Sequence, residues 1–353
     1  MHRRCAAMKA NINKFIEDFG FTRIVAVAFF LVVAILVPVL GLNTLTLYSQ
    51  ALVRIAMNGV LVLTMVPIMV CGAGMNFALP IGIICGLLGG LISLNMELTG
   101  FTGFFAAIIF SIPFSLVLGY LYGLLMNRVK GSEMMIATYV GFAMISIMCI
   151  VWLFIPLDNL ILRMQMGRGV RKDVVLSDYW SQILDNFMAI NIGELTIPTG
   201  TFLFLFVLCF LVYLYMHSKT GMMMRAAGQN PGLAEANGIN VDRMRIWGIT
   251  LSTVLGGIGI LVYAQSFGFL QFYDSPRMMS FSAVAAVLIG GASNKKASIF
   301  NVLFGVMVFQ GLLTLSLPVA NQILPESNIS DIVRMIISNG IILYALGKGT
   351  GRK

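Results

Sequence analysis

The sequence predicts an all-α fold, a polytopic bundle of transmembrane helices, from two observations. Of the 353 residues, 59% are hydrophobic and only 10% are charged, whereas an ordinary soluble domain has about 25% charged residues. The apolar residues also fall in long blocks, and about 20 such residues in a helix cross a hydrocarbon layer about 30 Å thick. We therefore expect residues 1–353 to form a single transmembrane domain whose solvent is the bilayer.

The apolar blocks predict about ten spans. These spans cover residues 24–41, 52–71, 78–95, 103–125, 134–155, 200–217, 246–265, 279–293, 298–318 and 330–347. The first is interpreted as a retained helix, because no small-residue cleavage site follows it. The span at 78–95 is rich in glycine and the one at 279–293 is short. Such segments are often broken or partly crossing helices that line a cavity, so we expect a break in the bundle near them.

The charges are distributed unequally between the two sides of this bundle. The side that holds both termini, 127–133, 218–245 and 294–297 carries 16 basic and five acidic residues, and the rest of the chain carries 7 and 9. Because loops rich in Lys and Arg stay in the cytoplasm, we expect a multi-pass membrane protein with both termini cytoplasmic. The basic excess is thus topogenic, and no nucleic-acid partner is expected.

The segment 156–198 then forms an extracytoplasmic loop. A loop of this length is either a solvated connection or a functional element. Its functional interpretation is a contact surface for a protein that delivers solute from outside. Both interpretations remain open on the sequence alone.

The cytoplasmic loop 218–245 is the most informative segment. Asn230 is a suitable N-cap, Pro231 a suitable first helical residue, and Gly238 a suitable residue just past the helix end. Only about two turns lie between them, and so short a helix is marginal in water. We therefore expect it to be held by packing against something else.

Residues 221–241 resemble the corresponding loop of permeases from ATP-binding-cassette (ABC) importers, in the branch of the ribose and galactose permeases. The matching residues are Gly221, Arg225, Ala226, Gly228, Asn230, Pro231, Ala234, Ala236, Gly238, Ile239 and Val241. The resemblance implies that the helix near 231–237 is a coupling helix, which docks in a cleft of a cytoplasmic ATPase. It also implies that Gly228 and Gly238 fix turns and that Arg225 and Glu235 contact the ATPase.

Two weaker matches accompany this loop. The segment from Gly74 to Gly82 resembles the glycine-rich segment at a membrane break in the family, although Asn76 and Ala78 stand where the family has Asp and Ser. The other match is the Gly290–Ser293 segment after a short apolar run. Related permeases for branched-chain amino acids more often have acidic residues where this chain has 228–230. The sugar-type branch is therefore favoured, and the solute itself stays open.

The resemblance implies a permease subunit, in a bacterial inner membrane, that forms the transmembrane path for a sugar or similar small polar solute. Its partners would be an ABC ATPase, an extracytoplasmic solute-binding protein, a second copy or a sister permease, and membrane lipid. The alternatives are a branched-chain amino acid or nucleoside ABC permease, or an ion-coupled secondary transporter. Secondary transporters often keep carboxylates within their spans, and no secure span interior here contains one.

No enzymatic or metal site is predicted. His2 and His217 have no candidate catalytic partner, the five cysteines show no ligand spacing, and no glycine-rich phosphate loop is followed by a lysine. We expect no cofactor on this chain, with ATP and magnesium held by the partner ATPase.

Polar side chains within spans are costly and are the default candidates for a pathway. Those candidates are Asn58, Asn76, Gln265, Asn301 and Gln310. Neutral amides both donate and accept hydrogen bonds, which suits hydroxyl-rich solutes. The alternative is that these amides join helices to one another.

Overall fold

The computed structural model describes residues 21–323 except 156, 158, 160–161, 165–168 and 294–296, together with residue 340. The predicted span at 330–347 therefore lies outside the described residues apart from residue 340, as do the basic residues before Arg23 and those after residue 340.

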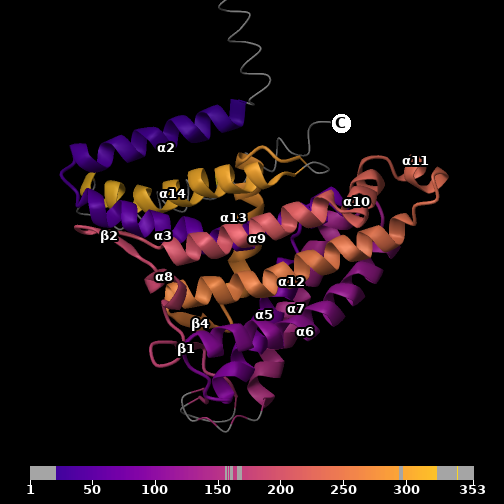
Figure 1. Cartoon of the computed structure of the whole chain (residues 1–353), viewed down its shortest axis with the longest axis horizontal. Coiled ribbons are helices and arrows are strands. Elements are labelled where there is room, and N and C mark those ends of the chain that lie inside the picture. The colour runs from indigo at the N-terminus through magenta and orange to yellow at the C-terminus, as the bar shows by residue number, and fades with distance from the viewer. Residues whose placement is uncertain are drawn as a thin grey trace, which may run out of the picture.

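Helices make up most of the described chain (Figure 1), which confirms the all-α prediction. They are α2 (Phe21–Val39), α3 (Thr44–Leu63), α4 (Met65–Val70), α5 (Leu79–Asn95), α6 (Gly100–Arg128), α7 (Glu133–Phe154), α8 (Ile183–Asn186), α9 (Thr199–His217), α10 (Lys219–Gln229), α11 (Pro231–Ala236), α12 (Val241–Phe267), α13 (Ser275–Ile289) and α14 (Ile299–Ile323). Two antiparallel pairs of short strands join β1 (Asp173–Val175) to β4 (Phe269–Gln271) and β2 (Ile190–Ile192) to β3 (Leu195–Ile197).

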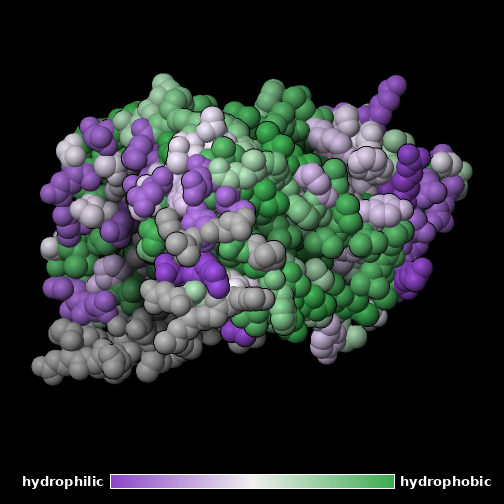
Figure 2. Space-filling view, turned by 90° about the horizontal axis from the view of Figure 1, so that it is seen from below, coloured by the Kyte–Doolittle hydropathy of each residue, from purple (hydrophilic) through white to green (hydrophobic). Residues whose placement is uncertain are grey.

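Six stretches of helix in the described chain are long and apolar enough to cross a membrane. They are Thr44–Val70, Gly100–Arg128, Glu133–Phe154, Thr199–His217, Val241–Phe267 and Ile299–Ile323, and shorter apolar helices cover Arg23–Val39, Leu79–Asn95 and Met279–Ile289. A predicted span coincides with each of them. Figure 2 shows an apolar belt between two hydrophilic ends, as expected for a polytopic bundle.

Some helices begin earlier than the predicted spans, because a polar N-cap starts the helix several residues before its apolar part. Helix α3 begins at Thr44 rather than near residue 52, where the Asn43 side chain accepts a hydrogen bond from the Thr46 N–H at 3.4 Å. Helix α12 begins at Val241 rather than near 246, because Asn240 accepts one from the Arg243 N–H at 2.9 Å. Hydropathy marks the hydrocarbon layer, whereas caps mark helix ends.

Helices α5, α6 and α12 pack together through small residues. A Cβ placed on Gly86 of α5 would lie 2.4 Å from the Gly257 carbonyl oxygen of α12. One placed on Gly82 would lie 2.7 Å from the Thr253 carbonyl oxygen. In membrane bundles such residues let helix backbones approach closely. The glycines of the 78–95 span therefore serve close packing within α5, and the chain is broken just before it, at residues 71–78.

The described part of the 156–198 segment is folded against the ends of the spans. Strand β1 pairs with β4, which follows α12, and Trp180 is fully buried. Lys172 Nζ lies 2.9 Å from Asp274 Oδ2 ahead of α13, and this hydrogen-bonded ion pair raises the pKa of Lys172. The described part of this segment is thus more than a solvated connection, because it forms an ordered cover over one end of the bundle.

Candidate functional site

The helix expected near 231–237 is α11, and its caps are those that the sequence predicts. Asn230 Oδ1 accepts a hydrogen bond from the Leu233 N–H at 3.1 Å, and Pro231 is the first helical residue. Gly238 has a φ of +77°. Its N–H donates to the Glu235 carbonyl at 2.9 Å, and the Ile239 N–H donates to the Ala234 carbonyl at 3.0 Å. This is a Schellman ending, which requires a left-handed residue such as glycine.

Helix α11 is exposed at the tip of the molecule (Figure 1). Leu233 is 62% exposed and Glu235 is also exposed, whereas Ala234 is the one buried residue of this helix. An isolated six-residue helix with an exposed leucine is marginal in water. The packing that we expected for it is therefore largely absent from the described part of the chain itself.

A second helix of the loop, α10, was missed by the sequence analysis. Ser218 caps it, with its Oγ accepting from the Gly221 N–H at 3.3 Å. Its buried residues are Gly221, Met224, Ala227 and Gly228, and Arg225 is exposed. Those buried positions have helical spacing. That spacing could have predicted α10 from the sequence. The pattern is weak, because its members are small residues and one methionine.

The structure corrects the role predicted for Gly228, which lies in the last turn of α10 rather than in a turn between elements. A Cβ on Gly228 would lie 2.1 Å from the Val70 carbonyl oxygen, and one on Gly72 would lie 2.9 Å from the Gly228 Cα. A Cβ on Gly248 of α12 would lie 2.6 Å from Cys71 Sγ. We call Gly72, Gly228 and Gly248 the glycine junction, where α10 and α12 meet the end of α4.

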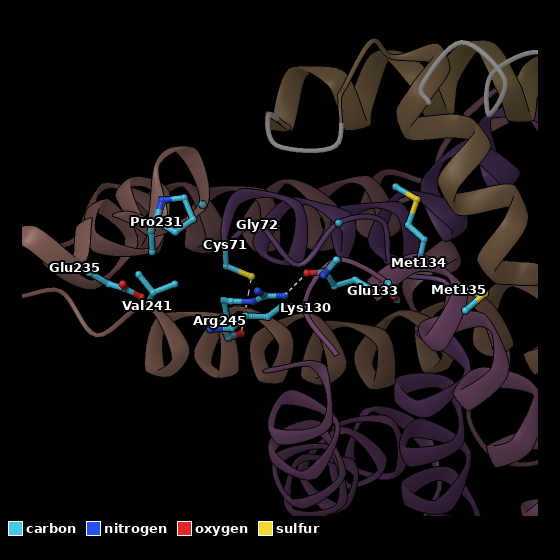
Figure 3. Close-up of a pocket in the computed structure, with 15 residues that line it drawn as sticks. Cys71, Gly72, Lys130, Glu133, Met134, Met135, Pro231, Glu235, Val241 and Arg245 are labelled. Atoms are coloured by element: carbon cyan, nitrogen blue, oxygen red, sulfur yellow. Dashed lines mark hydrogen bonds and ion pairs between the residues drawn. The ribbon is translucent and has the colours of Figure 1, made fainter. Parts of the chain in front are cut away.

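Beside the glycine junction lies a cavity of about 640 Å³, bounded by α11, the connection between α6 and α7, and the start of α12 (Figure 3). Arg245 Nη2 lies 2.8 Å from Glu133 Oε1, and both side chains are mostly buried. Glu133 Oε2 also accepts a hydrogen bond from the Gly131 N–H at 2.9 Å. This ion pair therefore fixes the α6–α7 connection to α12. Sequence reasoning counted both charges for orientation but did not pair them.

The break at 71–78 contains Asn76, the pathway candidate that is 3% exposed. Its Nδ2 donates to Ser252 Oγ on α12 at 2.9 Å, and Ser252 in turn donates to the Thr64 carbonyl at 2.8 Å. The Asn76 Oδ1 has no hydrogen-bond partner among the described residues. An unpaired buried acceptor beside irregular backbone is a suitable contact for a polar solute.

The other four candidates lie apart from Asn76. Gln265 is fully buried, where its Oε1 accepts from the Leu184 N–H at 3.2 Å and its Nε2 donates to Ser266 Oγ at 2.6 Å. Asn58 donates to the Arg54 carbonyl at 2.9 Å, Asn301 pairs with Ser298 at the start of α14, and Gln310 is buried within α14. Among the described residues, no hydrogen bond joins any two of the five candidates.

Three phenylalanines that the sequence analysis did not single out lie beside the break. The Phe281 ring of α13 is centred 5.7 Å from that of Phe77 and 6.3 Å from that of Phe142 on α7. A hollow of about 10 Å³ between them is also lined by Thr138, Arg277 and Ser280. The Ser280 hydroxyl is buried without a partner among the described residues. We call Phe77, Phe142 and Phe281 the aromatic trio.

Comparison with known proteins identifies the family. The model of a family described as "Branched-chain amino acid transport system / permease component" matches residues 11–346, which is nearly the whole chain. The chain belongs to this permease family. The sequence-based resemblance to ABC-importer permeases is thereby confirmed, and so is the multi-pass membrane architecture.

Three curated relatives are similar to parts of the chain. A nucleoside ABC transporter permease of Lactococcus lactis subsp. cremoris is 27% identical over 141 residues, which is 40% of this chain and 44% of that protein. A guanosine ABC transporter permease of Bacillus subtilis is 31% identical over 78 residues, 22% of this chain and 24% of that protein. A galactose/methyl galactoside import permease of Salmonella typhimurium is 27% identical over 169 residues, 47% of each.

The matched segments thus span less than half the length of these relatives. No solved structure matches the chain at a comparable level of significance.

Proposed function

We propose that this chain is the transmembrane subunit of an ABC importer for a small, hydroxyl-rich solute, a sugar or a nucleoside. The observation that carries the proposal is α11, a capped helix that stands exposed between the long apolar helices α9 and α12. Its exposed surface is free to contact a partner. Helix α10 connects it to α9, and residues 237–240 connect it to α12. The names of the nucleoside, guanosine and galactose relatives support the solute class.

In this proposal α11 docks on a separate ATPase subunit. Leu233 supplies an apolar contact, and Glu235 and Arg225 supply charged ones. Because the Gly228 backbone touches the backbone of residues 70–72, α10 cannot shift without moving the end of α4. Movement of α11 would therefore reach the break at 71–78, where Asn76 lies.

The solute path in this proposal passes the break. Asn76 Oδ1 and the Ser280 hydroxyl offer unsatisfied polar atoms to a solute, and the aromatic trio offers ring faces. Aromatic side chains stack well on nucleobases, and amides suit ribose hydroxyls. The trio thus suits a nucleoside as the solute.

The position of α11 also sets the orientation of the chain and the places of the remaining partners in this proposal. The end with α11 faces the cytoplasm with both chain termini, and ATP and magnesium are held by the ATPase. A solute-binding protein docks at the opposite end, and a second copy or a sister permease completes the path. No carboxylate lies in the interior of a spanning helix that the structure describes, which favours this mechanism over ion coupling.

Uptake of labelled guanosine, uridine and galactose by cells expressing the transporter tests the proposal. We expect ATP-dependent uptake of one of these solutes that persists when the membrane potential is collapsed at constant ATP. Uptake that follows the ion gradient instead, or that survives deletion of every partner ATPase, would contradict it.

A further inference from the structure

An exposed groove between α6 and α12 has no part in the proposed transport cycle. It holds about 610 Å³ and is lined from α6 by Leu116 and Tyr120 and from α12 by Arg243, Ile246, Trp247 and Thr250, with Asn240 and Asp242 at its mouth. The groove lies along the first turns of α12, the helix that follows α11 in the chain, and its lining changes there from charged to apolar residues.

Close packing of glycines creates the groove. A Cβ on Gly119 would lie 3.0 Å from the Thr250 Cα, and one on Gly123 would lie 3.1 Å from the Ile246 Cα, so the two backbones touch along this line. Larger side chains flank this contact. Tyr120 is 51% exposed and Trp247 is 46% exposed, and they form walls with no neighbouring helix between them in the described chain.

The charges at the groove mouth leave one cation available. Lys130 Nζ lies 2.6 Å from Asp242 Oδ1, which neutralises that carboxylate. The backbone N–H of Arg243 is used by the Asn240 cap, but its guanidinium has no ion-pair or hydrogen-bond partner among the described residues. An exposed guanidinium above an apolar, aromatic-walled groove fits a phosphate group that is attached to hydrocarbon chains.

We propose that this groove binds an anionic phospholipid from the leaflet next to α11. The Arg243 guanidinium holds the headgroup phosphate, Tyr120 and Trp247 lie at headgroup level, and an acyl chain lies along Leu116 and Ile246. Aromatic side chains prefer this depth of the membrane, and a basic side chain there favours anionic lipid. Such a lipid would lie against the first turn of α12, next to the α11 loop.

Trp247 supplies a direct probe of this site. Of the three tryptophans, Trp152 and Trp180 are fully buried, so lipid-borne quenchers reach Trp247 first. The full-length protein is placed in phosphatidylcholine nanodiscs with increasing fractions of brominated phosphatidylglycerol or brominated phosphatidylcholine. We expect the anionic lipid to quench at about a fivefold lower mole fraction, the effect of one basic residue at an anionic membrane surface.

Three variants define the origin of any preference. Arg243→Gln should bring the two lipids to equal quenching, and Trp247→Phe should remove the quenched emission. Lys219→Gln removes an exposed cation from α10, outside the groove, and should keep the preference. Equal quenching in the unmodified protein, or a preference that survives Arg243→Gln, overturns the proposal. Loss of quenching by both lipids after an ATPase subunit is added also overturns it, because the groove would then be a protein contact.

Discussion

The two hydrophilic ends of the molecule differ in how they use their polar and apolar groups. At one end, α11 exposes Leu233 and Glu235 and contacts the rest of the chain through little more than Ala234. At the other, Gln265 and Asp185 join α8, α9 and α12 by hydrogen bonds, and Trp180 is buried. The polar side chains of Gln265 and Asp185 at the second end thus bond within the chain, whereas α11 at the first end leaves an apolar side chain exposed. The difference supports the proposal that α11 docks on a partner.

The largest expected effect comes from the glycine junction, on which the α11 end depends. We expect Gly228→Ala to lower uptake at least tenfold, because the new Cβ would meet the Val70 carbonyl at 2.1 Å and backbone must move. Gly232→Ala in α11 is the matched control, since its Cβ would meet nothing closer than Asn230 Oδ1 at 3.9 Å. Equal uptake by the two variants would show that the junction does not matter.

The Glu133–Arg245 ion pair should give the next largest effect. Glu133→Ala leaves the Arg245 guanidinium, whose side chain is 8% exposed, without its carboxylate. We expect the free energy of unfolding to fall by about 3 kcal/mol, measured by denaturation in detergent. The double variant Glu133→Ala/Arg245→Met should recover part of this loss, because no unpaired charge remains. A double variant as unstable as the sum of the singles would contradict the pairing.

At the opposite end, Gln265→Ala tests whether the hydrogen bonds of Gln265 hold the 156–198 segment against the spans. The variant leaves the buried Leu184 N–H without its side-chain acceptor, so we expect stability to fall by about 2 kcal/mol. Faster proteolysis within 176–198 should accompany this loss. If Gln265→Ala instead changes solute selectivity at unchanged stability, Gln265 belongs to the pathway.

The smallest effect on stability should come from Leu233→Asp. Because Leu233 is 62% exposed, we expect the free energy of unfolding to stay within about 0.5 kcal/mol. Affinity for the partner ATPase, measured by titration of the purified subunits, should nevertheless fall at least tenfold. Unchanged affinity would mean that this face of α11 is not the contact.

Local rules made much of this architecture predictable from the sequence. Hydropathy located the spans, because a bilayer demands long apolar helices, and Asn230, Pro231 and Gly238 located α11, because caps depend on neighbouring residues. The contacts of Gly228 with the end of α4 were not predictable, since the residues are distant in the sequence and glycine has several uses. The same holds for the aromatic trio, whose members are ordinary span residues until the fold brings them together.

The central claim is that α11 is the contact to an ATPase subunit. Its most direct test replaces the native cysteines, introduces Glu235→Cys, and applies a short bifunctional cross-linker to the assembled transporter. Ser177→Cys at the opposite end is the control, because Ser177 is also exposed to solvent. We predict a cross-link from Glu235→Cys to a nucleotide-binding subunit, with a yield that changes when ATP is added, and none from Ser177→Cys. A cross-link to that subunit from Ser177→Cys alone would contradict the account.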